Sequence, residues 1–216
     1  YDFSHELLRE AAYAGLSQAR RRWLHGAVAR ALEEVHAADL DQAAELIAGH
    51  LELAGQAGRA SAYYEQAAQV AEQLFALPRA IALTQRAIAL HLTHSPVDPV
   101  AARLYEALGY RKLISGAYEA ARQALRRSLD FLDSAGGITA ARLQRRIAQC
   151  WSSQQRYFEA GQAIEAALAA LGERPTDGEE NAWRAEWLEL RLFQVDTLYF
   201  KNDPPAMQVV CDLLEG

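Results

Sequence analysis

The residues best suited to bind a metal are two histidines near the middle of the chain. His91 and His94 lie three positions apart in a segment with helical periodicity, so both imidazoles face one side of a helix. A zinc site needs three or four such ligands, and no cysteine or further histidine lies at a matching spacing. His5-Glu6 begins a zinc-protease motif, but Arg9 stands where that motif needs a second histidine. The sequence therefore predicts no metal site and no cofactor.

Two pairs of adjacent carboxylates, Glu33-Glu34 and Glu179-Glu180, are the candidates for acid–base chemistry. Successive residues of a helix point about 100° apart, so neither pair converges on one substrate as the carboxylates of a glycosidase do. Cys150 has no base at a recognisable spacing that would activate it as a nucleophile. We predict that the chain is not an enzyme.

The sequence also lacks the residues that bind a nucleotide. A phosphate-binding loop requires Gly-x-x-x-x-Gly-Lys followed by Ser or Thr. The two lysines of the chain, Lys112 and Lys201, follow Arg111 and Phe200 instead. We predict that this chain alone neither binds nor hydrolyses a nucleotide.

The composition favours a helical protein. Of 216 residues, 51% are hydrophobic, and the chain has only 13 glycines and 6 prolines. The net charge of −6 argues against a general nucleic-acid binder, although residues 101–150 are basic and residues 151–216 are acidic. Two cysteines without a disulfide framework indicate a reducing, cytoplasmic location. No apolar run reaches the length of a membrane span.

Apolar residues recur at helical spacing along most of the chain. Ser17 is the predicted N-cap of a helix over residues 18–36, and a second helix is predicted over residues 41–55. His25 and His50 fall within these helices, where we expect each to be packed with one hydrogen bond. The predicted buried face of the first helix consists of Trp23, Leu24, Ala27, Val28, Ala31 and Leu32. The same spacing places all four tryptophans in the core, namely Trp23, Trp151, Trp183 and Trp187.

The sequence pattern of a helical hairpin occurs twice between residues 108 and 167. Small residues in it would let two helices approach closely, and an aromatic residue would fill the turn between them. Such a hairpin cannot bury its apolar face alone, so it is expected to stack on further copies. The first copy contains Leu108, Gly109, Gly116, Tyr118, Ala121, Leu125 and Ser128, and the second, 39 positions later, contains Ile147, Ala148, Gln155, Tyr157, Ala160, Ile164 and Ala167.

This pattern resembles the tetratricopeptide repeat, in which Leu-Gly is followed by Gly-x-Tyr-x-x-Ala. The resemblance implies an all-α fold in which antiparallel helix pairs wind into a right-handed superhelix, an α-solenoid. We expect residues 1–55 to be a helical linker and residues 56–216 to be the repeats. The predicted repeats cover approximately residues 61–94, 102–135, 141–174 and 187–216.

The first ninety residues resemble a second family. Phe3 to Tyr13, Arg20 to His25 and Ala44 to Gly55 are similar to the segment after the winged helix of bacterial STAND-type signalling ATPases. These AAA-like proteins continue into a helical-repeat arm, and many carry a LuxR-type DNA-binding domain or an adenylate/guanylate cyclase. The resemblance implies that the chain is part of a longer protein whose winged helix and ATPase precede Tyr1.

The remaining candidate site is the inner surface of the array, which the first helix of each repeat lines. Three arginines there, Arg103, Arg142 and Arg145, suit an acidic segment because guanidinium groups form bidentate bonds with carboxylates. The alternative is a surface that is only solvated, or that another part of the same protein covers. The predicted groove comprises Glu65, Gln69, Glu72, Arg103, Glu106, Tyr110, Arg142, Arg145, Gln149, Ser152 and Arg191.

The sequence thus leads to three hypotheses for function. The first is a non-catalytic arm that senses an effector or partner, or another domain of the parent protein, and regulates a STAND-type ATPase. The second is a stand-alone adaptor that binds an acidic peptide or protein in its groove. A third, nucleic-acid contact or an enzyme-accessory role through residues 103–146, is disfavoured by the acidic net charge. None of the three involves a membrane.

Overall fold

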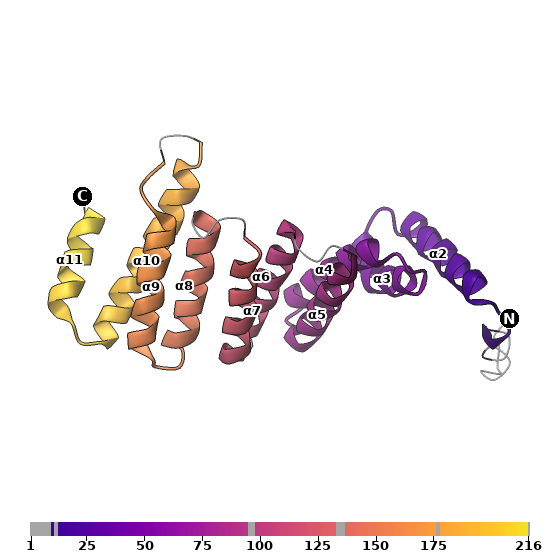
Figure 1. Ribbon diagram of the computed structural model, residues 1–216, viewed down its shortest axis with the longest axis horizontal. Helices are drawn as coiled ribbons and strands as arrows, with labels where there is room; N and C mark the ends of the chain where they lie inside the picture. Colours follow the sequence, from indigo (N-terminus) through magenta and orange to yellow (C-terminus); the bar gives the residue numbers. More distant parts are fainter. Residues whose placement is uncertain (1–9, 11–12, 95–97, 133–136, 176–177, 216) are drawn as a thin grey trace. The chain divides into compact units, whose positions relative to one another are not determined.

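In the computed structural model, residues 10, 13–94, 98–132, 137–175 and 178–215 are described (Figure 1). Within these ranges the chain forms α-helices and one short 3-10 helix, with no strand, which confirms the all-α prediction. The elements are α2 (Gln18–Val35), η1 (Leu40–Ala43), α3 (Ala44–Leu53), α4 (Ala57–Gln73), α5 (Leu77–His94), α6 (Pro99–Ile114), α7 (Tyr118–Asp130), α8 (Ile138–Ser152), α9 (Tyr157–Leu171), α10 (Glu180–Phe200) and α11 (Pro204–Glu215).

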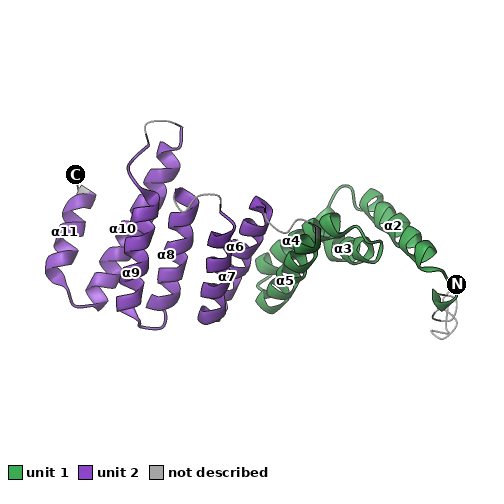
Figure 2. Ribbon diagram, viewed as in Figure 1, with its two compact units in different colours: residues 1–96 green, residues 97–216 purple. Residues whose placement is uncertain are grey.

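The helices form two compact units, which Figure 2 colours separately. Residues 1–96 contain α2 to α5, and residues 97–216 contain α6 to α11. The predicted start of the repeats at residue 56 lies inside the first unit, between α3 and α4. The division into a linker and four repeats stays a prediction.

Small residues bring the two helices of each hairpin together, as the repeated pattern predicts. Ala121 in α7 and Ala160 in α9 are both completely buried. Gly109 in α6 faces Leu125 in α7 so closely that an added Cβ would lie 2.6 Å from Leu125 Cγ. This distance is well below ordinary van der Waals contact, so only glycine fits there. The crossing therefore depends on the absence of a side chain at residue 109.

A serine hydroxyl also joins the helices at two of these crossings. In the α4–α5 hairpin, Ser61 on the first helix donates to the Ala87 carbonyl at 2.8 Å. In the α6–α7 hairpin, Ser128 on the second helix donates to the Ala102 carbonyl at 2.7 Å. Both hydroxyls are buried, where a hydrogen bond is needed to offset their lost hydration. The serine lies on the first helix in one hairpin and on the second helix in the other, yet both hydroxyls bond to a backbone carbonyl of the facing helix.

In the described part of the chain, five helices end in the same left-handed turn. In each, one backbone amide bonds to the carbonyl five residues back and the preceding amide to the carbonyl three residues back, which together define a Schellman motif. At Gly116, glycine adopts this positive φ without strain. The turn residues with positive φ are Gly55, Phe75, Gly116, Gln155 and Asn202.

The predicted buried face of α2 is wrong in part. Ser17 does cap the helix, accepting from the Arg20 amide at 3.3 Å. Trp23, however, is 65% exposed, and the buried residues of α2 are Gly26 and Ala29. An added Cβ at residue 26 would lie 3.4 Å from a side-chain atom of the turn between α3 and α4. Leu32 packs against the core cluster, as predicted, whereas Trp23 and Val28 stay exposed. Close approach through small residues therefore orients α2.

The other tryptophans lie against the core, as predicted, although none is completely buried. Trp151 packs against the cluster that includes Leu125 and Leu143. Trp183 and Trp187 pack beside Leu190, with their ring centroids 6.2 Å apart and the planes nearly parallel. These contacts hold α10 against α8 and α9.

Candidate interaction surface

Helices α6, α8 and α10 carry charged residues that face one another within the second unit. Glu106 of α6 accepts from Arg142 Nε of α8 at 2.7 Å and from Arg146 Nη1 at 2.9 Å. The Glu106 side chain is only 14% exposed, so both bonds are partly shielded from water. One carboxylate therefore holds two arginines of the neighbouring first helix.

A second ion pair continues this arrangement from α8 to α10. Arg145 binds Glu186 with two parallel hydrogen bonds, Nε to Oε1 at 2.6 Å and Nη2 to Oε2 at 3.1 Å. Their side chains are 13% and 7% exposed. A further carboxylate, Glu189, lies 3.6 Å from Arg145 Nη1. The bidentate geometry predicted for a ligand carboxylate is thus already present, with a partner from the same chain.

The environment changes the proton affinity of these arginines in opposite directions. The hydrogen bond to Glu106 raises the pKa of Arg142, because it favours the charged guanidinium. Burial lowers the pKa of Arg146, which also lies 4.8 Å from the centre of the Tyr110 ring. Both groups remain cationic at neutral pH, since arginine titrates far above it.

The structure therefore brings together four of the predicted groove residues, Glu106, Tyr110, Arg142 and Arg145. Sequence reasoning missed the other members of this charged cluster, Arg146, Glu186 and Glu189. The pair Arg145–Glu186 joins residues 41 positions apart. A signal was present in the sequence, since Arg145 and Arg146 are adjacent and α10 carries several carboxylates, but spacing alone does not select the partner.

Within the described residues, the other predicted groove residues of this unit make no hydrogen bond to the cluster. Arg103 is exposed, whereas Gln149 and Ser152 are half-buried. Arg191 donates to Gln194 at 2.9 Å on its own helix. Arg103 is consequently the arginine of the predicted groove that is most open to solvent.

Three predicted groove residues belong to α4 in the first unit. Glu65 is buried, Gln69 is exposed and Glu72 is half-buried. Gln69 Nε2 lies 3.5 Å from Glu65 Oε1, at the limit of a hydrogen bond. These residues are described within their own unit, and their part in a shared groove stays a prediction.

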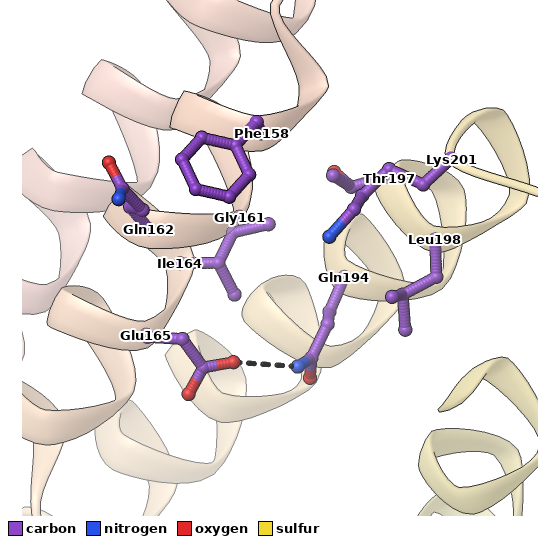
Figure 3. Close-up of a pocket in the computed structure, with 9 residues that line it drawn as sticks. All are labelled: Phe158, Gly161, Gln162, Ile164, Glu165, Gln194, Thr197, Leu198 and Lys201. Carbon is purple, nitrogen blue, oxygen red and sulfur yellow. Dashed lines mark hydrogen bonds between the residues drawn. The ribbon is translucent and has the colours of Figure 1, made fainter. Parts of the chain in front are cut away.

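A cleft of about 230 Å³ lies between α9 and α10 (Figure 3). Gln194 of α10 donates to Glu165 of α9 at 3.3 Å on one side of it. Sequence reasoning did not predict this cleft. Its lining residues are Phe158, Gly161, Gln162, Ile164, Glu165, Gln194, Thr197, Leu198 and Lys201.

The corresponding space between α7 and α8 is filled by an arginine. Arg122 of α7 is buried, and its guanidinium carbon lies 3.5 Å from the centre of the Trp151 ring. Its terminal nitrogens donate to Gln154, at 2.5 Å, and to Glu119. Arg156 lies near the same indole ring, 4.3 Å from its centre. The tryptophan thus contacts two guanidinium groups.

His25 and His50 form a pair that the sequence did not reveal. Their Nδ1 atoms lie 2.8 Å apart, and Tyr13 Oη lies 2.9 Å from His25 Nε2. Burial, followed by the nearby His25, lowers the pKa of His50. Among the described residues, no group of three His, Cys, Asp or Glu side chains could hold a metal ion. The pair joins α2 to α3 as a packing contact with a hydrogen bond.

Cys150 is buried in the second unit, and its thiol is not a nucleophile at neutral pH. Burial raises the pKa of Cys150 to about 11. Because the thiolate is the reactive form, almost none is present near pH 7. Cys211 is half-buried, and both cysteines are free thiols. Within the described part of the chain, no helix combines the length and apolar character that a bilayer crossing needs.

Comparisons with known proteins agree with this helical geometry. One crystal structure of TPR-like repeats, from a Podosopora anserina protein described as a kinesin light chain, matches with a TM-score of 0.63. It is 13% identical and the match covers 91% of this chain and 93% of that one. A variant of those repeats with a substituted residue matches with a TM-score of 0.65 and 14% identity, covering 92% and 94%. The chain has a TPR-like fold. No family model and no curated protein matches the sequence.

Proposed function

We propose that the chain is a non-catalytic protein-interaction arm. The observation that carries this proposal is the surface of α6, α8 and α10, where consecutive first helices present charged and aromatic side chains side by side. The likeness to TPR-like repeats supports the same role, because stacked helical hairpins provide extended surfaces for protein partners. The partner is a protein segment or another domain of the parent protein.

The finer proposal is that this arm regulates a STAND-type ATPase in the cytoplasm. Its support is the resemblance of Phe3–Tyr13, Arg20–His25 and Ala44–Gly55 to the segment between ATPase and repeats in that class. A partner that binds one conformation of the arm more tightly shifts the population towards that conformation. The attached ATPase would respond only to the difference in affinity between the two conformations.

ATP turnover by the parent protein tests the regulatory proposal. Arg103→Glu reverses a charge at an exposed groove position and leaves the buried ion pairs intact. Arg127→Glu is the matched control, because Arg127 is exposed on α7 and, among the described residues, forms an ion pair only with Asp130, at 3.4 Å. We expect partner-dependent turnover to change in the first variant and not in the second. A parent protein without a nucleotide-binding module before Tyr1 would refute the regulatory role.

The second candidate is an adaptor that binds an acidic segment. The exposed Arg103 favours it, as does the excess of basic residues between 101 and 150. An acidic peptide would have to compete with Glu106 and Glu186 for Arg142 and Arg145. We therefore expect weak, salt-sensitive binding of a poly-glutamate peptide, measured by fluorescence anisotropy, that Arg103→Glu removes.

A further inference from the structure

The cleft between α9 and α10 carries a glycine where the matching groove between α7 and α8 carries an arginine. The turn residues Gly116 and Gln155, both with positive φ, align hairpin α6–α7 with hairpin α8–α9. This alignment places Gly161 of α9 at the position that Arg122 occupies in α7. Arg122 fills its groove, whereas an added Cβ at residue 161 would meet no atom closer than 3.8 Å.

The opposite wall of the cleft also carries a smaller side chain than the matching wall of the α7–α8 groove. The turn residues Gln155 and Asn202 align α8 with α10 and place Leu198 at the position of Trp151. The large indole that stacks on Arg122 thus becomes a smaller aliphatic side chain. Both substitutions enlarge the groove, so the hollow arises from the two helices together.

The chemistry of the cleft suits one large apolar side chain. Its floor includes the buried Ile164 and the half-buried Leu198, and Phe158 stands at the mouth with 68% of its surface exposed. Figure 3 shows Phe158, Gly161 and Ile164 on one side of the open space and Leu198 on the other. A volume of about 230 Å³ is smaller than the roughly 300–1,000 Å³ typical of small-molecule sites. The space fits a side chain better than a metabolite.

Exposed aromatic rings extend this surface beyond the cleft. Tyr157 and Phe200 stack with their ring centroids 5.2 Å apart, and Tyr199 meets Phe200 edge to face at 5.5 Å. Tyr199 and Phe200 are mostly exposed, although large aromatic side chains are usually buried. Contiguous exposed aromatic residues are typical of protein–protein interfaces.

The net charge of this part of the chain favours a basic partner. Residues 151–216 carry five Lys or Arg and twelve Asp or Glu, so a cationic segment is attracted to this part of the chain. Glu165 on the rim can accept a hydrogen bond from such a cation, while Lys201 disfavours one at the other end. We propose that the α9–α10 cleft binds a protein segment that inserts one leucine- or phenylalanine-sized side chain and carries Lys or Arg beside it.

This inference rests on the proposed interaction role but uses a different surface from the Glu106 cluster. A random-peptide phage library selected against the whole chain is a probe that presupposes no sequence. We expect the enriched peptides to share one large apolar residue flanked by Lys or Arg. Gly161→Leu fills the cleft from within, and Ala169→Leu adds the same bulk at an exposed site on the same helix.

Affinity for an enriched peptide should fall about tenfold or more in Gly161→Leu, the loss expected when one large apolar side chain is no longer buried. It should be unchanged in Ala169→Leu, and Phe158→Ala should weaken it because that ring forms the mouth. Gly161→Leu should melt no lower than the wild type, since leucine is the better helix former. Glu165→Lys should remove the preference for basic peptides.

Three results would overturn the inference: no enriched peptide, a consensus without a basic residue, or binding that Gly161→Leu leaves intact. Peptides that depend on Arg103 instead would support the adaptor role while refuting the cleft. The two proposals therefore fail separately.

Discussion

Hairpins α6–α7 and α8–α9 show which parts of a helical repeat are fixed and which are free to vary. At the crossings, the two hairpins are nearly identical, with Ala121 and Ala160 both completely buried. At the groove towards the next helix they differ, since one carries Arg122 and the other Gly161. The crossing sets the distance between helices, so it tolerates only small residues. The groove lies outside it, so its occupant can differ without changing the fold.

The position shared by Arg122 and Gly161 has a different role in each hairpin. Arg122 packs on an indole ring and stabilises its own hairpin. Gly161 contributes nothing comparable and leaves a cavity instead. A repeat protein can thus convert a structural position into a surface for a partner by substituting two residues, one from each wall.

Introducing charge at the crossings should have the largest effect, and the effect should be equal in the two hairpins. Ala160→Glu and Ala121→Arg each force a bulky, ionised group into a completely buried site. We expect losses of about 3 kcal/mol or more in the free energy of unfolding, measured by urea denaturation. Ala169→Glu, at an exposed position of α9, is the control and should change it little. A normal unfolding midpoint for Ala160→Glu would refute the crossing assigned here.

Emptying the filled groove should have the next largest effect. Arg122→Ala removes a buried side chain, two hydrogen bonds and a contact with Trp151. We expect a loss of about 2–3 kcal/mol, since the contact is shielded from water. Arg156→Ala removes a contact with the same ring from an exposed side chain and should cost about 0.5 kcal/mol. Equal losses in the two variants would contradict the assignment of Arg122 as the side chain that fills the groove.

The crossings could be predicted from sequence because they depend on local spacing. Gly109 and Ala121 have the small counterparts Ala148 and Ala160 in the second copy, and helical geometry brings the members of each pair together. The ion pairs could not be predicted, because their partners lie on different hairpins. Arg145 was expected to hold a ligand carboxylate, yet Glu186 of α10 already occupies it. Periodicity indicates the face of a helix but not what the next helix places against it.

The orientation of α2 shows the limit of periodicity within a single helix. Trp23 and Val28 lie at apolar spacing, and both are exposed. Gly26 and Ala29 make the contact instead, because α2 approaches its neighbours closely. A prediction that weights hydrophobicity selects the bulky residues, whereas close helix packing selects the small ones.

Adding a methyl group at Gly109 and at Gly161 should have opposite effects. At Gly109 the new Cβ would lie 2.6 Å from Leu125 Cγ, so Gly109→Ala should cost about 1–2 kcal/mol by overpacking. At Gly161 the same change meets only the flexible end of Lys201, at 3.8 Å. Gly161→Ala should therefore stabilise the protein by up to about 1 kcal/mol through helix propensity. Thermal melts of the two variants and the wild type test this prediction. A shift of both melting temperatures in the same direction would contradict it.

The smallest effects are expected at the turns, where the two hairpins adopt one conformation with different residues. Gly116 has a φ of +81° and Gln155 a φ of +60°, and an L side chain in this region costs about 1–2 kcal/mol. Gly116→Ala should lower the free energy of unfolding by about 1 kcal/mol. Gln155→Gly should raise it by about 0.5 kcal/mol, because the relief of strain is partly offset by the greater entropy of glycine in the unfolded chain. Both residues are exposed, so lost packing does not complicate the measurement. If the urea midpoints of the two variants shift in opposite directions, the left-handed turn is a feature of the repeat that forms with or without glycine. Glycine at residue 116 then only relieves the backbone strain of that turn.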